Sequence, residues 1–390
     1  MSDSYTSVAD VKGLVANVNN TAKNFEAAAG GDVHLARRTL QLEARKLLYS
    51  LEEPNTEVWP RVYQVNVGAA IEVVSKLGLW SKFEGEKTIS LAQIVQETKA
   101  DEIMIIRIFR QLTAAGILEE IPGAGYALTT IGQPYLNSDH RAFNDLIFND
   151  IIPAIMAMPR TLAERGYKAP TKESGTPYKW ANGEELWTWL GSHPDRAMNM
   201  GMSPATPTLP HPFGSEVAKL NLKDDDVAIV DIAGGQGHIM EEVRERNPNI
   251  KGRFIVQDLP STFAAVSGPP AGVEFMEYDI FTPQPVKNAS IYYYRHIFHD
   301  WSDGDCTTFL EQVVPLLKEQ PESKLLLVDL VLPDTNATMQ EAIQGISMFP
   351  IGGLERTETQ WSKLLAKSGL KIKKIWRGSE PEACVECELL

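Results

Sequence analysis

The segment RHIFHDWSD, from Arg295 to Asp303, gathers in nine residues several side chains that commonly do chemistry in proteins. Histidine and aspartate bind metals, assist nucleophiles, or move protons as general acids and bases. A metal site would need His296, His299 and Asp303 to converge, but the segment is expected to be a non-helical loop with no cysteine–histidine cluster nearby. The CVEC sequence near the C-terminus lacks the second thiol pair that a four-cysteine site requires. We therefore disfavour a metal site.

A serine nucleophile is also disfavoured, because the chain has no G-x-S-x-G motif and its glycine-rich turn carries Gln236 where a serine would stand. General-base chemistry remains. A phenol has a pKa of about 10 and is a poor nucleophile until deprotonated, and a neutral imidazole with a pKa of about 6.5 can take its proton. His299 is the candidate base, whereas His296, next to a predicted strand, is expected to be structural.

The elements around this segment place it at the edge of a sheet. The sequence SIYYYR, residues 290–295, predicts a strand, and Ser302 with Asp305 forms a capping signature that opens a helix over 306–317. Residues 296–301 then lie at the carboxyl end of a parallel strand, where open α/β sheets bind ligands. Asp305 is expected to cap this helix rather than to act in catalysis.

A glycine-rich turn joins an earlier strand, VAIVDIA, to a helix through Gly234, Gly235 and Gly237. Glycines let the backbone turn tightly and approach a ligand, and the helix N-terminus offers unpaired N–H groups. Such a turn also occurs without any ligand. The next strand ends in Asp258, 21 residues after Gly237, where a carboxylate can accept hydrogen bonds from ribose hydroxyls.

Charge distinguishes between the ligands that this turn can bind. Asp231 ends the first strand and would repel a pyrophosphate, and a dinucleotide motif starting at Gly235 would have Met240 in its third glycine position. S-adenosylmethionine carries an ammonium and a sulfonium group, so it suits this carboxylate better than NAD does. Asp279 ends a further strand, and Ile280 beside it can contact an adenine.

The wider sequence predicts an α/β domain preceded by helices. Short apolar strands alternate with helices over 221–390, which is typical of a parallel sheet covered on both faces. Residues 1–165 are mostly helical and contain a helix–helix–hairpin pattern of the winged-helix type. Residues 88–135 hold three basic and five acidic residues, so we expect packing or dimerisation rather than binding to nucleic acid. Residues 166–220 are expected to connect the domains and to line a ligand pocket.

Composition favours a cytoplasmic protein. The N-terminus lacks the basic and apolar regions of a secretory signal, and three cysteines make a disulfide framework unexpected. No apolar run approaches the roughly 18 residues that a membrane span needs. The net charge of −14 argues against nucleic acid and anionic membranes as partners.

The motifs VDIAGGQG, FIVQDLP, MEYDIF, RHIFHDWSD and GGLERTETQW resemble, in this order, those of cation-independent O-methyltransferases that use S-adenosylmethionine. These are the caffeic-acid type of plants and their fungal natural-product relatives, and the resemblance spans nearly the whole chain. It implies a Rossmann-like class I methyltransferase domain over 221–390 and a winged-helix dimerisation domain over 1–165. It also implies a homodimer, an aromatic or polyketide-type small-molecule acceptor, and methyl transfer to a phenol or enol.

Matched motif by motif, the resemblance gives His299 the role of base, framed by Asp329 and Glu355. Met348 resembles an acceptor-pocket position of the family. The expected cofactor-binding residues are Asp231, Gly234, Gly235, Gly237, Asp258, Leu259, Asp279, Ile280 and Arg295.

Two further residues are candidates for the acceptor pocket. Met202, in RAMNMGM, can pack on an aromatic ring, although ordinary helix packing explains this methionine equally well. Trp301 is expected beneath the cofactor or the loop, with a direct acceptor contact as the alternative.

Two features of the sequence depart from the family pattern. Ala233 replaces a glycine common in the family turn, which we expect to cost little because alanine is small. The segment from Met348 to Gly352 is shorter than in plant relatives, so the acceptor itself is not predicted.

Two other activities stay open. The first alternative is a methyltransferase-like lyase or cyclase that keeps S-adenosylmethionine only as a structural cation, and the retained His299, Asp329 and Glu355 argue against it. NAD-linked oxidoreduction is the second.

Overall fold

The computed structural model describes residues 8–29, 32–85, 87–170, 175–201, 209–264, 266, 268–378 and 382–390. The chain forms two compact units. Unit 1 comprises Met1–Ser50, Ala157–Leu186 and Thr206–Leu390, and unit 2 comprises Leu51–Met156 and Trp187–Ala205. The sequence predicted domain boundaries at residues 165 and 220, and these two units are divided at other positions. The predicted boundaries concern domains that fold independently, and they stay a prediction.

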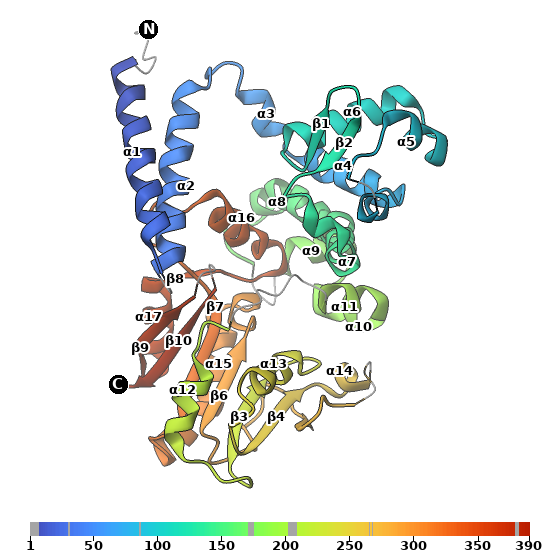
Figure 1. The fold of residues 1–390 in the computed structure, drawn as a ribbon. Coiled ribbons are helices and arrows are strands. Elements are labelled where there is room, and N and C mark those ends of the chain that lie inside the picture. The colour runs from blue at the N-terminus through green and yellow to red at the C-terminus, as the bar shows by residue number, and fades with distance from the viewer. Residues whose placement is uncertain are drawn as a thin grey trace. The chain divides into compact units, whose positions relative to one another are not determined.

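Unit 1 is built on an eight-stranded sheet in the order β5-β4-β3-β6-β7-β10-β9, with β8 paired to β7 (Figure 1). The strands are β3 (Val227–Ile232), β4 (Arg253–Asp258), β5 (Val273–Glu277), β6 (Ile291–Arg295), β7 (Lys324–Leu332), β8 (Arg356–Thr357), β9 (Leu370–Arg377) and β10 (Glu382–Leu389). Strands β3 to β7 pair in parallel, and β10 lies antiparallel between β7 and β9. This mixed α/β sheet is the predicted Rossmann-like fold.

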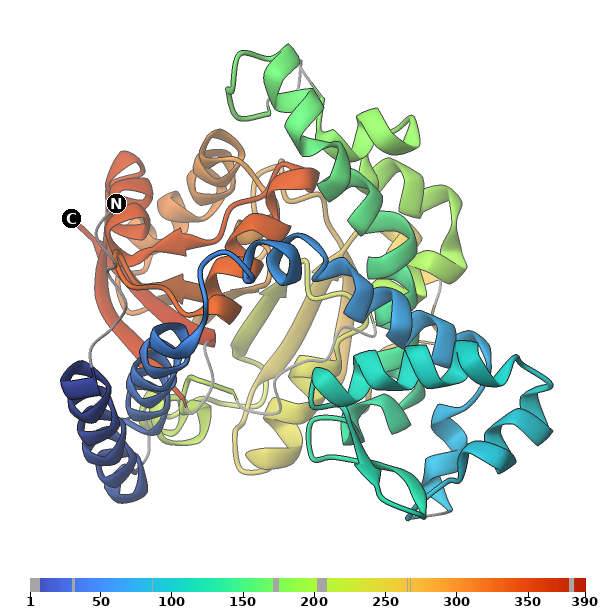
Figure 2. The ribbon, with the colours of Figure 1, turned by 90° about the horizontal axis from the view of Figure 1, so that it is seen from above.

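Helices cover both faces of the sheet, as the continuous apolar strands predicted. On one face, α15 (Asp303–Glu319) and α17 (Glu358–Lys367) pack on side chains such as Tyr292 and Leu327. On the other, α12 (Phe213–Val217) and α13 (His238–Arg246) pack on neighbours such as Tyr293. Figure 2 shows the strands between these helices. Alternate residues of β6 therefore serve two separate cores.

The remaining elements of unit 1 are short, apart from the two helices at the N-terminus. They are α9 (Pro177–Asn182), η4 (Ala218–Leu220), α14 (Pro260–Ala264), η5 (Phe298–Asp300), α16 (Met339–Ser347) and η6 (Phe349–Ile351), and the greater part of α8 (Ile152–Glu164) also belongs to this unit.

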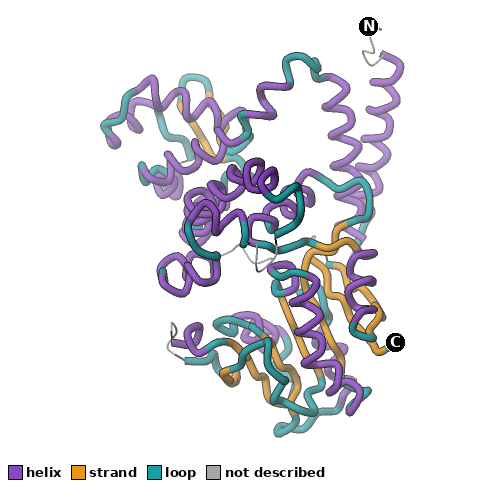
Figure 3. Tube along the Cα trace, turned by 180° about the vertical axis from the view of Figure 1, so that it is seen from behind, coloured by secondary structure: helices purple, strands orange, loops and turns teal. Residues whose placement is uncertain are grey.

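The first two helices, α1 (Val8–Ala27) and α2 (Asp32–Leu51), run side by side as an antiparallel pair (Figures 1 and 3). An ion pair joins α2 to α16, because Arg38 Nε lies 2.9 Å from Glu341 Oε1. Glu341 is 5% exposed and also completes the capping box with Thr338 at the start of α16. One carboxylate thus caps α16 and fixes it to α2.

Unit 2 contains the predicted winged-helix pattern. Helices α5 (Leu91–Thr98) and α6 (Glu102–Ala114) precede the hairpin of β1 (Leu118–Ile121) and β2 (Gly125–Leu128). Ser90 and Asp101 cap the two helices, as side-chain oxygens at these positions favour. The other elements are α3 (Val58–Val62), α4 (Val65–Lys76), η1 (Trp80–Glu84), η2 (Gln133–Leu136), α7 (Ser138–Leu146), a π-helical turn (Ile147–Ile151), α10 (Leu186–Ser192) and α11 (Pro194–Gly201).

The continuous helix Ser138–Glu164 is long and apolar enough to cross a membrane. It is not apolar all round, because Asp145 and Asp150 both pair with Arg196 of α11. Leu146 and Ile151 are buried on another side of the same helix. A face of ion pairs beside a buried apolar face is typical of a core helix in a soluble protein. The acidic residues interrupt the apolar run, which is why the sequence alone does not indicate a membrane span here.

Candidate active site

The RHIFHDWSD segment lies at the carboxyl end of β6, as predicted. Strand β6 ends at Arg295, and Ser302 caps α15 by accepting a hydrogen bond from the backbone N–H of Asp305 over 3.3 Å. One prediction for this loop was wrong. Residues Phe298–Asp300 form a turn of 3₁₀ helix, not an irregular loop, and Asp300 N–H donates to Ile297 O over 3.1 Å.

Three carboxylates surround the His299 ring. Its Nδ1 lies 2.8 Å from Glu355 Oε1, a hydrogen-bond distance, and 3.7 Å from Asp329 Oδ1. Its Nε2 lies 3.6 Å from Asp300 Oδ1. The structure therefore brings together the three residues predicted from the resemblance. It also adds Asp300, which sequence reasoning treated only as part of the loop.

Strand pairing explains why these carboxylates meet. Asp329 lies on β7, which pairs in parallel with β6 so that Val328 stands opposite Arg295. Short β8 then pairs with the end of β7 through Val331 and Arg356, which places Glu355 beside the same edge. A backbone bond from Leu354 N–H to His299 O, 2.7 Å long, fixes this segment against the histidine. The site thus draws on segments up to 56 residues apart.

The carboxylates change the proton affinity of the histidine. Burial opposes the charged imidazole, but Asp300, Asp329 and Glu355 outweigh this effect and raise the pKa of His299 from 6.5 to about 10. Burial raises the pKa of Asp329 to about 8, even though His299 lowers it. Burial likewise raises the pKa of Asp300 to about 6, against the influence of His299. This environment stabilises an imidazolium.

Strand β3, just before the glycine-rich turn, carries a buried carboxylate with one oxygen unpartnered in the part of the chain that the structure describes. Asp231 is 1% exposed, and its Oδ2 makes no hydrogen bond within the described residues. Burial raises the pKa of Asp231 to about 7. A Cβ added to Gly234 would collide with this Oδ2, so a larger residue does not fit at position 234. Gly235 and Gly237 both have positive φ, of 61° and 82°, which favours glycine there.

Ala233 shows that one expectation about this turn was wrong. Its φ is 58°, in the left-handed region that costs residues with a Cβ roughly 1–2 kcal/mol. The replacement of a glycine by alanine therefore matters through backbone conformation rather than through side-chain size.

Arg295 forms a buried ion pair that the sequence did not predict. Its Nε and Nη2 lie 2.9 and 3.0 Å from the two carboxylate oxygens of Glu382 on β10. The two side chains are 6% and 3% exposed, and His296 Nε2 lies 2.6 Å from the same carboxylate. Nη1 of Arg295 is buried without a hydrogen-bond partner in the described part of the chain.

The other predicted cofactor residues lie after β4 and β5. Asp258 accepts from Gly235 N–H through Oδ2 and from Leu259 N–H through Oδ1, over 2.9 and 2.7 Å. Leu259 is 48% exposed, and Asp279 caps its own turn by accepting from Phe281 N–H over 3.0 Å. Ile280 is half-buried. The strand ends therefore present one continuous edge from β6 to β5.

Two of the predicted acceptor residues are described. Trp301 packs edge-to-face on Phe281, with ring centroids 5.3 Å apart. Met348 ends α16 half-buried, and its carbonyl accepts from Gly353 N–H over 2.9 Å. Met202 lies outside the described residues.

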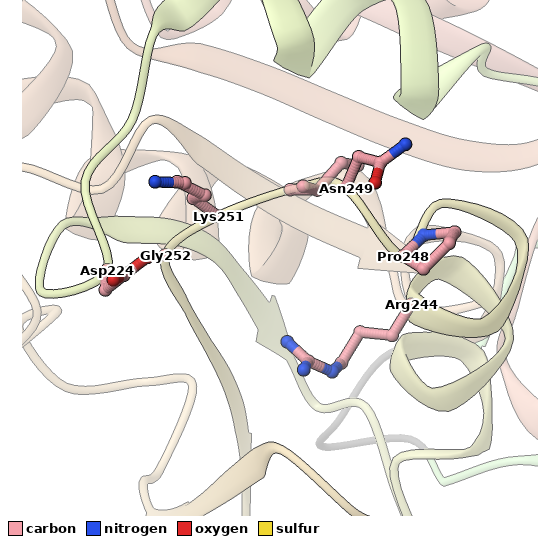
Figure 4. Close-up of a pocket in the computed structure, with 7 residues that line it drawn as sticks. Asp224, Arg244, Pro248, Asn249, Lys251 and Gly252 are labelled. Carbon is pink, nitrogen blue, oxygen red and sulfur yellow. The ribbon is translucent and has the colours of Figure 1, made fainter.

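A pocket elsewhere in unit 1 does not belong to this site. Figure 4 shows it lined by Asp224, Arg244 and the turn from Pro248 to Gly252. These residues precede β3 and β4, so the pocket lies at the amino ends of the strands. Ligands of open α/β sheets bind at the opposite, carboxyl ends.

The O-methyltransferase domain family matches residues 214–371. Demethylsterigmatocystin 6-O-methyltransferase of Aspergillus flavus is 34% identical over 327 residues, covering 80% of this chain and 84% of that protein.

Two solved structures align along almost the whole chain at 26% identity. OxaC in complex with S-adenosylhomocysteine and oxaline has a TM-score of 0.80, covering 97% of this chain and 99% of that one. A protein described as a pericyclic reaction enzyme has a TM-score of 0.82, covering 97% of this chain and 100% of that one.

The site geometry and these similarities agree with the predicted activity, cofactor and fold. S-adenosylmethionine is the cofactor, and the acceptor is a small-molecule metabolite. The chain belongs to the family of S-adenosylmethionine-dependent O-methyltransferases of secondary metabolism.

Proposed function

We propose that this enzyme methylates a phenolic or enolic hydroxyl with His299 as the general base. The observation that carries the proposal is the 2.8 Å contact between His299 Nδ1 and Glu355 Oε1. A carboxylate at this distance holds the Nδ1–H tautomer, so Nε2 is the nitrogen left to accept a proton. The acceptor hydroxyl would then approach His299 from the Nε2 side, next to Asp300.

The carboxylates adapt the base to a weakly acidic hydroxyl. A phenol with a pKa of about 10 and an ordinary imidazole differ by about 3.5 pH units, which makes proton transfer uphill by about 5 kcal/mol. With the pKa of His299 raised to about 10, the transfer is nearly balanced. The cost is that little of the free enzyme carries a neutral base at pH 7. We therefore expect turnover to increase as the pH rises towards 10.

The proposed cofactor-binding roles depend on two buried polar atoms of β3 and β6 that have no hydrogen-bond partner among the described residues. When bound, S-adenosylmethionine supplies an electrophilic methyl group next to a positively charged sulfur. Oδ2 of Asp231 is a buried acceptor suited to an ammonium, and Nη1 of Arg295 is a buried donor suited to a carboxylate. Both fit the amino-acid end of this cofactor. Asp258 and Leu259 would contact the ribose side.

At the adenine end of the same edge we propose Asp279 and Ile280. The turn glycines Gly234, Gly235 and Gly237 would let the backbone approach the cofactor closely.

We propose an aromatic or polyketide-type acceptor. Exposed apolar side chains follow one another on α16 and after it, with Ile343 at 52%, Ile346 at 54% and Leu354 at 37% exposure. They lie in the same segment as Met348, and Leu354 N–H donates to His299 O. Trp301 stays a candidate for the same pocket, and Met202, outside the described residues, stays an acceptor candidate from the sequence alone. The fungal relative is named for demethylsterigmatocystin and OxaC binds oxaline, and an aromatic acceptor would pack on an apolar surface of this kind.

A lyase or cyclase activity is the second candidate, favoured by the fold shared with the pericyclic reaction enzyme. A reaction of that class needs no base surrounded by three carboxylates, so the His299 cluster supports methyl transfer instead. The two activities differ in one product, because only methyl transfer converts S-adenosylmethionine into S-adenosylhomocysteine.

The test uses S-adenosylmethionine labelled in its methyl group and a panel of phenolic and enolic metabolites that includes demethylsterigmatocystin. Mass spectrometry should find a labelled methyl ether and S-adenosylhomocysteine in equal amounts. His299→Ala should abolish turnover and leave calorimetric binding of S-adenosylhomocysteine intact. Turnover that survives this substitution would remove His299 from the mechanism. A rearranged product without S-adenosylhomocysteine would favour the second candidate.

We also propose a cytoplasmic homodimer formed through the N-terminal region. Within unit 2, five large apolar side chains near α3 are more than half exposed, and two of them stack with ring centroids 6.0 Å apart. They are Leu51, Val58, Trp59, Val62 and Tyr63. An apolar cluster of this size on a soluble protein is typical of an interaction surface.

A further inference from the structure

Arg356 is a fully buried charged side chain near the catalytic edge, with 0% of its side chain exposed. It directly follows Glu355 in the sequence. A buried guanidinium is costly unless each of its donors finds a partner. The hydrogen-bond partners of Arg356 therefore indicate which part of the structure this residue stabilises.

Those partners are the backbone of the His299 loop. Nη1 of Arg356 donates to Phe298 O over 2.5 Å, and Nη2 donates to Trp301 O over 2.9 Å. These two carbonyls flank the turn that carries His299 and Asp300. Nε donates to Asp303 Oδ1 over 3.0 Å, at the first turn of α15.

Three further contacts complete the surroundings of the guanidinium. Nη1 reaches Leu354 O over 3.3 Å, Nη2 reaches Cys306 Sγ over 3.5 Å, and the Trp361 ring centroid lies 5.6 Å from the guanidinium carbon. One planar group thus spans the whole loop, which a lysine with a single nitrogen would not do.

The backbone next to Arg356 binds the carbonyl of His299, which lies between the carbonyls of Phe298 and Trp301 in the sequence. Leu354 N–H donates to His299 O over 2.7 Å, and a Cβ added to Gly353 would collide with that oxygen. The carbonyls of residues 298, 299 and 301 are therefore all bound by the segment 354–356. The same segment carries Glu355 and pairs with β7, the strand of Asp329.

We propose that Arg356 is a positioning residue for methyl transfer, which holds the His299 turn at hydrogen-bonding distance from Glu355. It acts through the loop carbonyls and touches neither the acceptor nor the cofactor. The inference rests on the proposed role of His299 as base. It predicts that loss of the fork-shaped guanidinium loosens the His299–Glu355 contact without disturbing the cofactor edge at β3 and β4.

The test compares Arg356→Lys, which keeps the charge but loses the fork, with Lys367→Met as a matched control. Lys367 is 55% exposed and pairs with Asp303 Oδ2 over 3.2 Å, so the control removes the other basic partner of that carboxylate and leaves Arg356 in place. Three quantities are measured: the calorimetric dissociation constant of S-adenosylhomocysteine, kcat for the acceptor found in the panel, and the titration of the His299 imidazole by NMR.

For Arg356→Lys we expect kcat to fall about 10- to 100-fold, as a small misplacement of a reacting group can cause. The His299 titration should move to lower pH, because a looser Glu355 stabilises the imidazolium less. The dissociation constant of S-adenosylhomocysteine should stay within about twofold, since a folded cofactor edge is retained. Lys367→Met should leave all three quantities unchanged.

A double substitution separates positioning from a general structural role. When Glu355 is already Gln, Arg356→Lys should cost much less in kcat, because the contact that it supports has been weakened. Equal costs in both backgrounds would overturn the inference. So would an unchanged His299 titration, or a loss of S-adenosylhomocysteine binding that parallels the loss of kcat. If His299→Ala retains turnover, the base role fails, while the NMR titration still decides whether Arg356 positions the ring.

Discussion

Glu355→Gln removes one negative charge from the His299 cluster and leaves an oxygen that can still accept from Nδ1. The wild-type carboxylate makes a charge-assisted hydrogen bond of 2.8 Å with His299, and its side chain is only 3% exposed. Such bonds contribute about 1.5–3 kcal/mol. At 1.36 kcal/mol for each pH unit, the pKa of His299 should fall by about one to two units from its raised value of about 10.

The direction in which Glu355→Gln shifts the pH dependence of kcat/KM depends on which protonation state of His299 is active. The base must be neutral, so kcat/KM rises with pH as the imidazolium loses its proton. A lower pKa therefore moves the rising limb of the profile towards neutral pH. The plateau above it should fall, because a weaker base accepts the proton of the acceptor less readily.

The assay is the pH dependence of kcat/KM between pH 6 and about 10.5, within which the predicted limb lies. Glu358→Gln is the matched control, since Glu358 lies three residues further along, is 59% exposed and sits 3.7 Å from Arg377. The control should reproduce the wild-type limb. A limb that stays in place in Glu355→Gln, or moves to higher pH, would refute the reasoning from the carboxylate cluster.

Three further predictions concern the cofactor edge and the surface. Asp231→Asn should stabilise the cofactor-free enzyme at pH 8 by up to about 4 kcal/mol, because burial raises the pKa of Asp231 from 3.8 to about 7 and the carboxyl therefore costs stability as the pH rises between these two values, a loss that is complete at pH 8. Urea denaturation at pH 4 and 8 checks this, and the same variant should bind S-adenosylhomocysteine more weakly. Glu382→Gln should weaken that binding about tenfold by freeing Arg295, whereas Glu388→Gln on the same strand, 42% exposed, should not. Trp59→Glu should convert the proposed dimer into a monomer in light scattering, and an unchanged mass would argue against this surface.

The sequence predicts best where a local pattern sets the structure. The apolar runs of β3, β4, β6 and β7 and the helices between them require a sheet covered on two faces, which the two cores confirm. Ser302 is a further example, since a cap depends on residues only three positions apart. The positive φ of Gly235 and Gly237 likewise follows from the residue type.

Contacts between distant segments were harder to predict. Glu382 reaches Arg295 across 87 residues, and only the antiparallel insertion of β10 beside β7 brings it there. Asp300 stands next to His299 in the sequence, yet its contact with Nε2 depends on the 3₁₀ turn that was not expected. Arg356 was visible in GGLERT, but nothing local shows that its guanidinium would bind the carbonyls of a loop more than 50 residues earlier.

The burial of the cysteines has a practical consequence for spectroscopy. Cys306, Cys384 and Cys387 are the three cysteines of the chain, and all are free and buried. Burial raises the pKa of each thiol, that of Cys306 to about 12, so little reactive thiolate forms at neutral pH. The native enzyme should therefore react very slowly with maleimide dyes. A single cysteine introduced at exposed Ile103 would label selectively and could report by fluorescence on motions of the winged-helix unit during turnover.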